Sequence, residues 1–325
     1  MNREHGGPDA HGVPRWDFST STNACGPCPA ALQAVQQADP VHYPDPRYTD
    51  LRHALAAFHQ VAPERIVPGA SASELIARIT ALAHRGGARR FWQPALAYGD
   101  YAQMARAWHM RQTDFATQAD LVWLCEPSSP QGVEEAQAWQ GAQAGSIVVL
   151  DRAYEPLRLR GQSSLMPVDL QHLWQLWSPN KAMGLAGVRG AYAIAPANAQ
   201  TLVQQLEMLA PSWAIGSQGV ALLQAWTSEE AQQWLASSRQ RLSLWKQQQV
   251  QLLEQLCWVC LPSFTNYFCA RAPGPVDVDT LRDQGIKLRD TRSLGLPGYW
   301  RLSVQPPEAQ GALRAALLRR KERVT

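Results

Sequence analysis

The 325-residue sequence lacks several features that would assign it to a special class of protein. No apolar run approaches the roughly 20 residues that cross a bilayer, and residues 1–7 form no apolar leader, so we expect neither a membrane span nor a signal peptide. The 30 Lys and Arg residues are scattered and leave a net charge of only +3, which argues against nucleic-acid binding. The composition, 46% hydrophobic and 18% charged, predicts a globular cytoplasmic protein with one large domain and one smaller one.

Cysteine is sparse, and its 6 copies include two Cys-x-x-Cys pairs. Cys25-Gly-Pro-Cys28 has the spacing of a thioredoxin-type redox motif, and Cys257-Trp-Val-Cys260 repeats it far downstream. A redox pair should open a helix directly after a strand, whereas Cys25 follows a polar loop. A shared zinc site would require the two pairs to meet across most of the chain. We therefore expect reduced, unpaired thiols and no metal, with redox or zinc chemistry as the alternative.

From residue 90 onward, short apolar runs alternate with helical patterns. The predicted strands are 90–94, 121–125, 145–151, 173–178 and 191–195. Such alternation predicts an α/β layer with a largely parallel sheet, in which sites lie beyond the carboxyl ends of the strands. Three polar segments follow predicted strands in that position: residues 126–132, 151–154 and 178–181.

The rest of the chain suggests the domain organisation. Residues 1–40, rich in Pro and Gly, read as an N-terminal arm that packs with the small domain, and 41–205 as the large domain. Residues 206–325 would supply a connecting helix and a smaller α+β domain. The helical periodicity spans 199–256 and is interrupted by Pro211. Two further strands are predicted at 266–270 and 299–304.

The polar segment after the predicted strand 173–178 contains Lys181, which is followed by small residues and then by Arg189. A lysine amine can link covalently to the aldehyde of pyridoxal 5'-phosphate (PLP). The hydroxyl of Ser178 and the guanidinium of Arg189 are suitable ligands for the cofactor phosphate. Taken alone, this pattern would also fit a surface lysine beside a Gly-rich turn.

A PLP site needs further parts, and the sequence offers a candidate for each. Asp151 could hold the proton on the pyridine nitrogen, Tyr154 could reach the phenolic oxygen, and Tyr98 could stack on the ring. Ala72 and Ser73 begin a helical pattern whose N–H groups could bind the phosphate, although plain N-capping by serine is the alternative. Because these residues occur together in a suitable order, we predict one site with Lys181, Asp151 and Tyr154 as its catalytic residues.

At these residues the sequence resembles the fold-type I PLP-dependent enzymes of the class I and II aminotransferase superfamily. Within them it is most similar to the branch that holds histidinol-phosphate aminotransferase and the threonine-phosphate decarboxylase of cobalamin biosynthesis. The resemblance covers essentially the whole chain and is strongest at 178–192, 151–154 and 299–304. It implies a mainly parallel large domain with a smaller C-terminal domain, PLP as cofactor and a homodimer with a shared active site. The motifs at 5–7, 17–27 and 69–76 resemble the decarboxylase more than the aminotransferase.

The resemblance also assigns roles to individual residues. Tyr43 would reach the cofactor phosphate of a neighbouring subunit, and Arg301 would hold the substrate carboxylate. Further substrate ligands implied in this way are Asn23 and Asn266 beside Arg301, and His5 and Arg289 for a phosphate on the substrate.

The sequence departs from the family pattern near the cofactor. Ser129 stands where the family has an asparagine that bonds the cofactor's phenolic oxygen, so more of that role would fall to Tyr154. Asn180 replaces the usual serine or threonine before the lysine, and Ser71 replaces a glycine in the phosphate loop. A PLP fold tolerates these changes, but they can lower the activity on the usual substrate of the family.

We expect decarboxylation of L-threonine O-3-phosphate to (R)-1-amino-2-propanol phosphate in cobalamin biosynthesis. The alternative is transamination of the histidinol-phosphate aminotransferase type. In both, the substrate is a small phosphorylated amino compound and no nucleic acid or membrane takes part. A third class of function, a binding or regulatory protein or a redox protein using Cys25 and Cys28, is disfavoured by the intact Lys181, Asp151 and Arg189.

Overall fold

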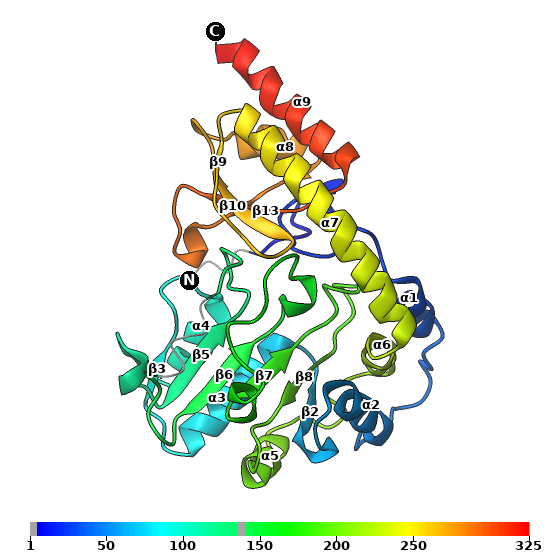
Figure 1. Cartoon of the computed structure of the whole chain (residues 1–325), viewed down its shortest axis with the longest axis vertical. Coiled ribbons are helices and arrows are strands. Elements are labelled where there is room, and N and C mark those ends of the chain that lie inside the picture. The colour runs from blue at the N-terminus through cyan, green and yellow to red at the C-terminus, as the bar shows by residue number, and fades with distance from the viewer. Residues whose placement is uncertain (1–4, 135–140, 325) are drawn as a thin grey trace.

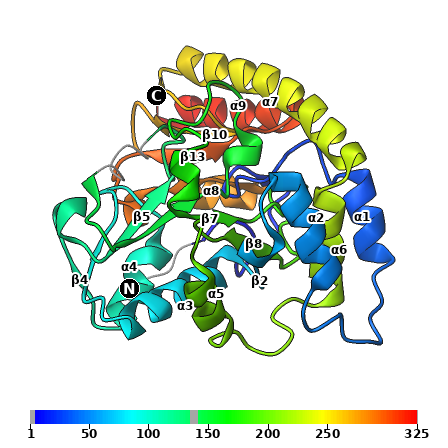
Figure 2. The same ribbon diagram turned by 60° about the horizontal axis from the view of Figure 1, so that its bottom comes forward.

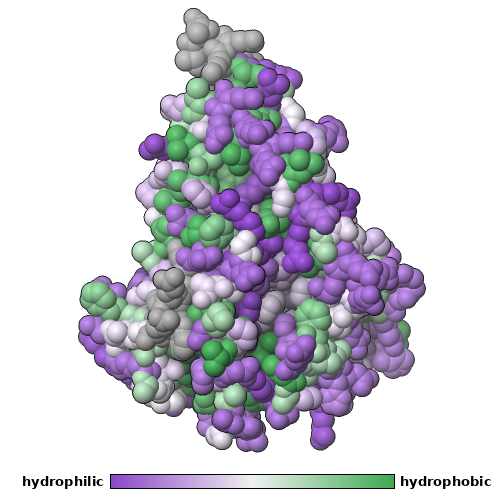
Figure 3. All heavy atoms as spheres, in the orientation of Figure 1, coloured by the Kyte–Doolittle hydropathy of each residue, from purple (hydrophilic) through white to green (hydrophobic). Residues whose placement is uncertain are grey.

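The computed structural model describes residues 5–134 and 141–324. Figure 1 shows a broad lower part built around a large sheet and a narrower upper part that ends in the C-terminal helix α9 (Pro307–Val324). The longest helix, α7 (Glu229–Gln255), runs along one side from the lower part to the upper part. Figure 3 shows the same taper, with hydrophilic and hydrophobic residues interspersed over the visible face.

The large sheet has seven strands. In spatial order they are β2 (Ile66–Gly69), β8 (Ala191–Ile194), β7 (Trp174–Trp177), β6 (Ile147–Asp151), β5 (Leu121–Cys125), β3 (Arg90–Trp92) and β4 (Arg111–Gln112). The strands from β7 to β4 are parallel, and β8 is antiparallel to both of its neighbours. The predicted α/β fold with a largely parallel sheet is therefore confirmed.

Helices cover both faces of this sheet because its strands are apolar on both sides. Trp123 and Val149 pack on one face with α3 (Ala72–Arg85), α4 (Gly99–Ala107) and α5 (Gln200–Glu207). Leu124 and Leu150 point to the other face and join a second buried cluster. Figure 2 shows α1 (Pro29–Gln36), α2 (Thr49–His59) and α6 (Ser217–Trp226) gathered at one side of the sheet.

The smaller, antiparallel sheet forms the upper part. Its order is β12 (Arg289–Asp290), β13 (Trp300–Ser303), β10 (Tyr267–Arg271) and β9 (Val259–Cys260). Phe268 and Leu302 from this sheet pack with Leu253 of α7 and Leu313 of α9, and helix α8 (Val278–Asp283) adds Leu281. Short 3-10 helices complete the chain at Pro63–Arg65, Ala116–Gln118, Glu155–Leu157, Asp169–Gln171 and Arg292–Leu294.

The N-terminal arm joins the upper part. Strand β1 (Trp16–Asp17) pairs in parallel with β11 (Ile286–Lys287), and Ser303 N donates to Phe18 O at 2.8 Å. Helix α6 lies beyond residue 205 and still packs against α1 and α2. The division at residues 40 and 205 stays a prediction. In the described part of the chain, no helix is both long enough and apolar enough to cross a membrane.

Two local features differ from the expectation. The periodic stretch 199–256 forms three helices, because the chain turns at Pro211 and because Ser228 accepts a hydrogen bond from Ala231 N to cap α7. Strand β2 is not among the predicted strands, and it contains Pro68. Proline is compatible with a strand at the sheet edge, which is where β2 lies.

Candidate active site

A pocket of ≈ 310 Å³ lies where the large sheet, the small sheet and the N-terminal arm meet. It opens beyond the carboxyl ends of β5, β6 and β7, as the sequence predicts. Twelve of the predicted site residues line it: His5, Ala72, Ser73, Tyr98, Ser129, Asp151, Tyr154, Ser178, Lys181, Arg189, Arg289 and Arg301. Among the described lining residues, four carry a positive charge and Asp151 supplies a carboxylate.

Asp151 ends β6 and is 4% exposed. Tyr101 Oη donates to its Oδ2 at 2.6 Å, and Ala153 N donates to its Oδ1 at 2.9 Å. Burial raises the pKa of Asp151, while the Tyr101 hydroxyl, the Ala153 N–H and the nearby Lys181 oppose that rise. Tyr101 therefore helps to keep this buried carboxylate ionised.

Lys181 lies in the turn that follows β7. Its Nζ is 5.4 Å from the centroid of the Tyr154 ring, and both residues line the same pocket as Asp151. Tyr154 is itself held by an edge-to-face contact with Tyr267, at 4.7 Å between centroids. Asn180 forms the turn: its Oδ1 accepts from Lys181 N at 3.0 Å and its Nδ2 donates to Ala186 O at 3.1 Å.

A second part of the pocket has the chemistry of a phosphate cradle. Helix α3 begins here, and Ser71 Oγ accepts from Glu74 N at 3.1 Å, so Ser71 caps the helix while Ala72 and Ser73 face the pocket. Ser178 Oγ is buried and has no hydrogen-bond partner in the described part of the chain. A helix N-terminus, an unpaired buried hydroxyl and the guanidinium of Arg189 are suitable donors for an anion.

Tyr98 borders this cradle. Its hydroxyl lies 3.2 Å from Ser73 Oγ, and burial raises the pKa of Tyr98, so the phenol stays protonated. Its ring meets that of Tyr101 edge to face, at 5.7 Å between centroids. The residues present therefore fit PLP: Tyr98 would lie beside the ring, Asp151 would hold the ring nitrogen and the α3 cradle would hold the phosphate.

The opposite wall carries two buried guanidinium groups. Arg289 and Arg301 are direct partners across β12 and β13, and they are 6% and 8% exposed. Arg301 Nη1 donates to Ser129 Oγ at 3.2 Å, and its Nε has no partner in the described part of the chain. Like charges opposite each other on neighbouring strands are unfavourable unless an anion lies between them. This wall is therefore suited to a ligand with strong negative charge.

Two hydroxyls beside these arginines were not predicted. Thr20 Oγ1 and Ser21 Oγ are buried at the pocket wall without a partner among the described residues. Asp17 shapes their loop, because its Oδ1 accepts from Ser19 N at 2.8 Å and from Thr20 N at 3.2 Å. The sequence motif at 17–27 marks the loop but does not say which hydroxyls face a ligand.

The loop that carries Ser129 is fixed by a buried ion pair. Glu126 accepts from Arg158 Nη2 at 3.0 Å and from Ser164 N at 2.7 Å, and Arg158 also contacts Glu155 at 2.9 Å. Tyr267 Oη donates to Ser128 O at 2.6 Å in the same loop. These contacts give Glu126 a role in holding Ser129 next to Arg301.

Three predicted residues do not line the pocket. Tyr43 is 76% exposed and stacks on Trp213, at 4.3 Å between centroids. Asn23 Nδ2 donates to Ala182 O at 3.0 Å, and Asn266 Nδ2 donates to Thr22 O at 3.0 Å. Both asparagines lie just behind the wall, where they bind the backbone of the chain itself.

All six cysteines are free thiols. Burial raises the pKa of both Cys25 and Cys28, which is opposite to the change that activates a redox thiol. Within residues 5–134 and 141–324, no cluster of His, Cys, Asp or Glu could hold a metal ion.

Comparison with known proteins assigns the chain to a family. The model of aminotransferase class I and II matches residues 16–316. The chain therefore belongs to the class I and II aminotransferases, within the fold-type I enzymes that use PLP. It is an enzyme of the aminotransferase or decarboxylase type.

The relatives by sequence include two histidinol-phosphate aminotransferases. Histidinol-phosphate aminotransferase 1 of Bradyrhizobium diazoefficiens is 27% identical and covers 91% of this chain and 90% of its own length. Histidinol-phosphate aminotransferase 2 of Thiobacillus denitrificans is 28% identical over 84% of this chain and 82% of its own length.

Solved structures show the same fold. The histidinol-phosphate aminotransferase of Sinorhizobium meliloti, in complex with PLP, has a TM-score of 0.78 at 22% identity, over 92% of this chain and 88% of its own. The L-threonine-O-3-phosphate decarboxylase of Porphyromonas gingivalis has a TM-score of 0.77 at 20% identity, over 94% of this chain and 99% of its own.

Proposed function

We propose that the protein catalyses a PLP-dependent reaction on a small phosphorylated amino compound, with transamination of the histidinol-phosphate type as the main reaction. The observation that carries this proposal is the wall of Arg289 and Arg301 opposite Lys181. The sequence motifs favoured the decarboxylase, but the curated relatives named above are aminotransferases, and they support the alternative better.

The residues divide the chemical work between them. When bound, PLP supplies an electron sink for the bond that breaks at the carbon bearing the amine. Asp151 holds the proton at the ring nitrogen, and Tyr101 keeps Asp151 ionised. Lys181 takes and returns a proton at the reacting carbon. Arg289 and Arg301 bind the negatively charged end of the substrate and orient it toward Lys181.

Decarboxylation of threonine phosphate is the second candidate. It is supported by the N-terminal arm, since His5 and Gly6 reach the pocket wall, and by the likeness in fold to the Porphyromonas gingivalis decarboxylase. The two reactions differ in which bond stands perpendicular to the cofactor ring. Two buried arginines can turn either a carboxylate or a phosphate into place.

A product assay separates the two reactions. The purified, PLP-loaded protein is given histidinol phosphate with 2-oxoglutarate, and separately O-phosphothreonine without a keto acid. Glutamate that forms only with the keto acid establishes transamination. Formation of carbon dioxide and aminopropanol phosphate without a keto acid would instead establish decarboxylation. The absence of product from either substrate would refute both proposed reactions.

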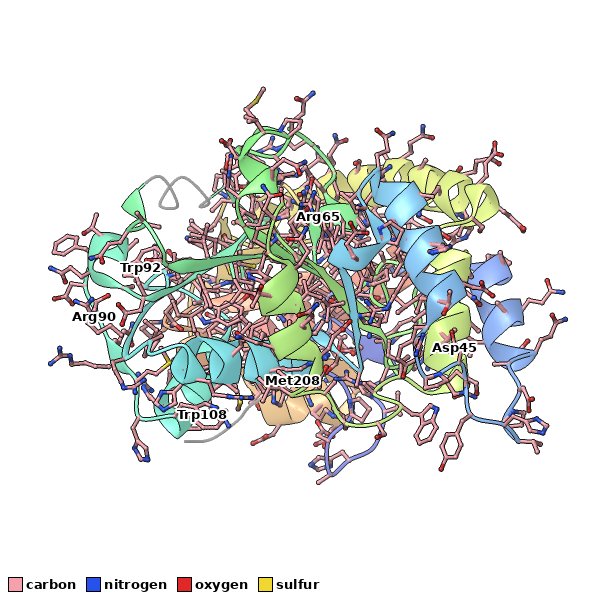
Figure 4. All side chains as sticks on the ribbon, turned by 90° about the horizontal axis from the view of Figure 1, so that it is seen from below. Asp45, Arg65, Arg90, Trp92, Trp108 and Met208 are labelled. Carbon is pink, nitrogen blue, oxygen red and sulfur yellow. The ribbon has the colours of Figure 1, made fainter. Side chains whose placement is uncertain are left out.

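We further propose that two copies pair and share their active sites in the cytoplasm. Support comes from the exposed Val41, Tyr43 and Met208, which are 78%, 76% and 69% exposed, and from the half-exposed Trp213. Figure 4 views the molecule from below and labels Met208 near the middle and Asp45 farther to the right. A groove of ≈ 950 Å³ runs from Pro46 past Glu207 to Trp213.

The dimer can be tested by mixing two inactive variants. Lys181→Ala and Tyr43→Ala are each expected to be impaired, and mixed dimers should regain part of the activity because one of their two sites is intact. A mixture that stays at the sum of its parts, or a monomer in sedimentation, would contradict the shared site.

A further inference from the structure

The segment 23–28 lies directly along the turn that carries Lys181. Asn23 N donates to Lys181 O at 2.9 Å, and Asn23 Nδ2 donates to Ala182 O at 3.0 Å. Cys28 N donates to Met183 O at 2.8 Å. Three consecutive carbonyls of the lysine turn are thus held by one segment of the N-terminal arm.

The side chain of Asn23 takes part in this arrangement at both ends of its amide. Its Oδ1 accepts from Cys25 N at 3.0 Å, and the residue is 3% exposed. Both ends of the amide therefore have protein partners, one in the segment itself and one in the lysine turn. The residue does not line the pocket, so its amide faces the backbone of the chain itself and not the ligand space.

Close packing strengthens the link. Gly184 has a φ of +69°, and a Cβ at this position would lie 2.3 Å from Gly26 O. The two backbones are in contact, so the lysine turn and the segment move together. Only glycine fits such a left-handed position at this distance.

The same arm is bound at its other end to the small sheet. Phe18 N donates to Lys287 O at 3.0 Å, and Ser303 N donates to Phe18 O at 2.8 Å. Ser303 is two residues from Arg301 on β13. The stretch from Phe18 to Cys28 thus connects the strand that carries the anion-binding wall with the turn that carries the lysine.

We propose that Asn23 is a positioning residue that fixes the Lys181 turn, and that it is not a ligand of the substrate. The proposal rests on the assignment of Lys181 as the residue that binds PLP. A long lysine side chain reaches a defined point only if its backbone is fixed, because small displacements at a reacting group are costly. The amide of Asn23 supplies that restraint from outside the pocket, and this gives the segment around Cys25-Gly-Pro-Cys28 a structural role.

Two substitutions test the contact. Asn23→Asp keeps the acceptor for Cys25 N but loses the donor to Ala182 O, and Asn23→Ala loses both. Cys25→Ser is the matched control, because its side chain lies on the same segment and points to Ser238 O on α7, at 3.7 Å from Sγ. Thermal unfolding of each apo-protein shows that the variants are folded before they are compared.

The readout uses PLP alone, without substrate. Apo-protein is mixed with PLP, and the growth of visible absorption that follows linkage to the lysine gives a rate; its pH titration gives a midpoint. Loss of one buried hydrogen bond should slow linkage about tenfold in Asn23→Asp and at least as much in Asn23→Ala, and should shift the midpoint. Cys25→Ser should stay within about twofold of the parent protein.

The opposite pattern would overturn the proposal. If both Asn23 variants link PLP at the parental rate and titrate with the parental midpoint, Asn23 does not position the lysine. A weaker affinity for substrate with unchanged PLP linkage would make Asn23 a substrate ligand instead. Because the primary readout needs no substrate, it remains valid even if the product assay excludes both proposed reactions.

Discussion

Replacing Tyr101 with phenylalanine should move the acid limb of the activity profile to higher pH. Tyr101 Oη donates to Asp151 Oδ2 at 2.6 Å, and both groups are buried. This bond stabilises the ionised carboxylate and so lowers the pKa of Asp151 against the effect of burial. Without it, Asp151 holds its proton to a higher pH and is less able to keep a proton on the cofactor nitrogen.

The size of the shift follows from the strength of the bond. A hydrogen bond to a charged group contributes about 1.5 to 3 kcal/mol, which corresponds to about one to two pH units in the pKa of Asp151. The assay is kcat/KM as a function of pH for Tyr101→Phe and the parent protein. Tyr192→Phe is the control, because its hydroxyl is also buried but bonds His59, at 2.7 Å, and Trp226, at 3.0 Å.

Tyr192→Phe should lose stability and keep the parental pH profile. An acid limb that stays in place in Tyr101→Phe would refute the role assigned to the Tyr101–Asp151 pair. A limb that moves equally in both variants would do the same, because the shift would then reflect a general loss of packing.

Three further predictions concern single side chains. Ser178→Ala should weaken PLP binding about tenfold, measured by equilibrium dialysis, and leave apo-protein unfolding unchanged, because Ser178 Oγ has no partner in the described part of the chain. Arg158→Met should cost about 3 to 5 kcal/mol in denaturant unfolding, because it removes the guanidinium that forms an ion pair with the buried Glu126. Burial lowers the pKa of Lys246 to about 7, whereas an unfolded lysine stays protonated well above that. Stability should therefore rise with pH above about 7 in thermal unfolding, and Lys246→Met should flatten that rise.

The fold was largely predictable because its signals are local. The strands Leu121–Cys125 and Ile147–Asp151 are short apolar runs that end in polar residues, and a parallel sheet brings such ends together. The start of α7 also has a local signal, since Ser228 precedes two glutamates. It was missed because helical periodicity continues through it. Strand β2 contains Pro68, whose edge position depends on the whole sheet.

The residue types of the candidate site could be predicted from the sequence, but the hydrogen-bond partners of those residues could not. Lys181 and Asp151 follow strands, and their chemistry is specific enough to name a cofactor. Tyr101 and Asp151 are 50 residues apart, and Asn23 and Ala182 are 159 residues apart, so no spacing reveals these bonds. The family resemblance assigns Asn23 to substrate binding. Its observed hydrogen bonds depend instead on how the N-terminal arm folds back on the large sheet.

The most direct test of the central claim is to locate the residue that binds PLP. The protein is loaded with PLP, the link is made permanent with borohydride, and the peptides are identified by mass spectrometry. The account predicts the modification on Lys181, and no visible absorption or turnover in Lys181→Ala. PLP fixed to another lysine, or a Lys181→Ala variant that keeps both the absorption and the activity, would contradict it.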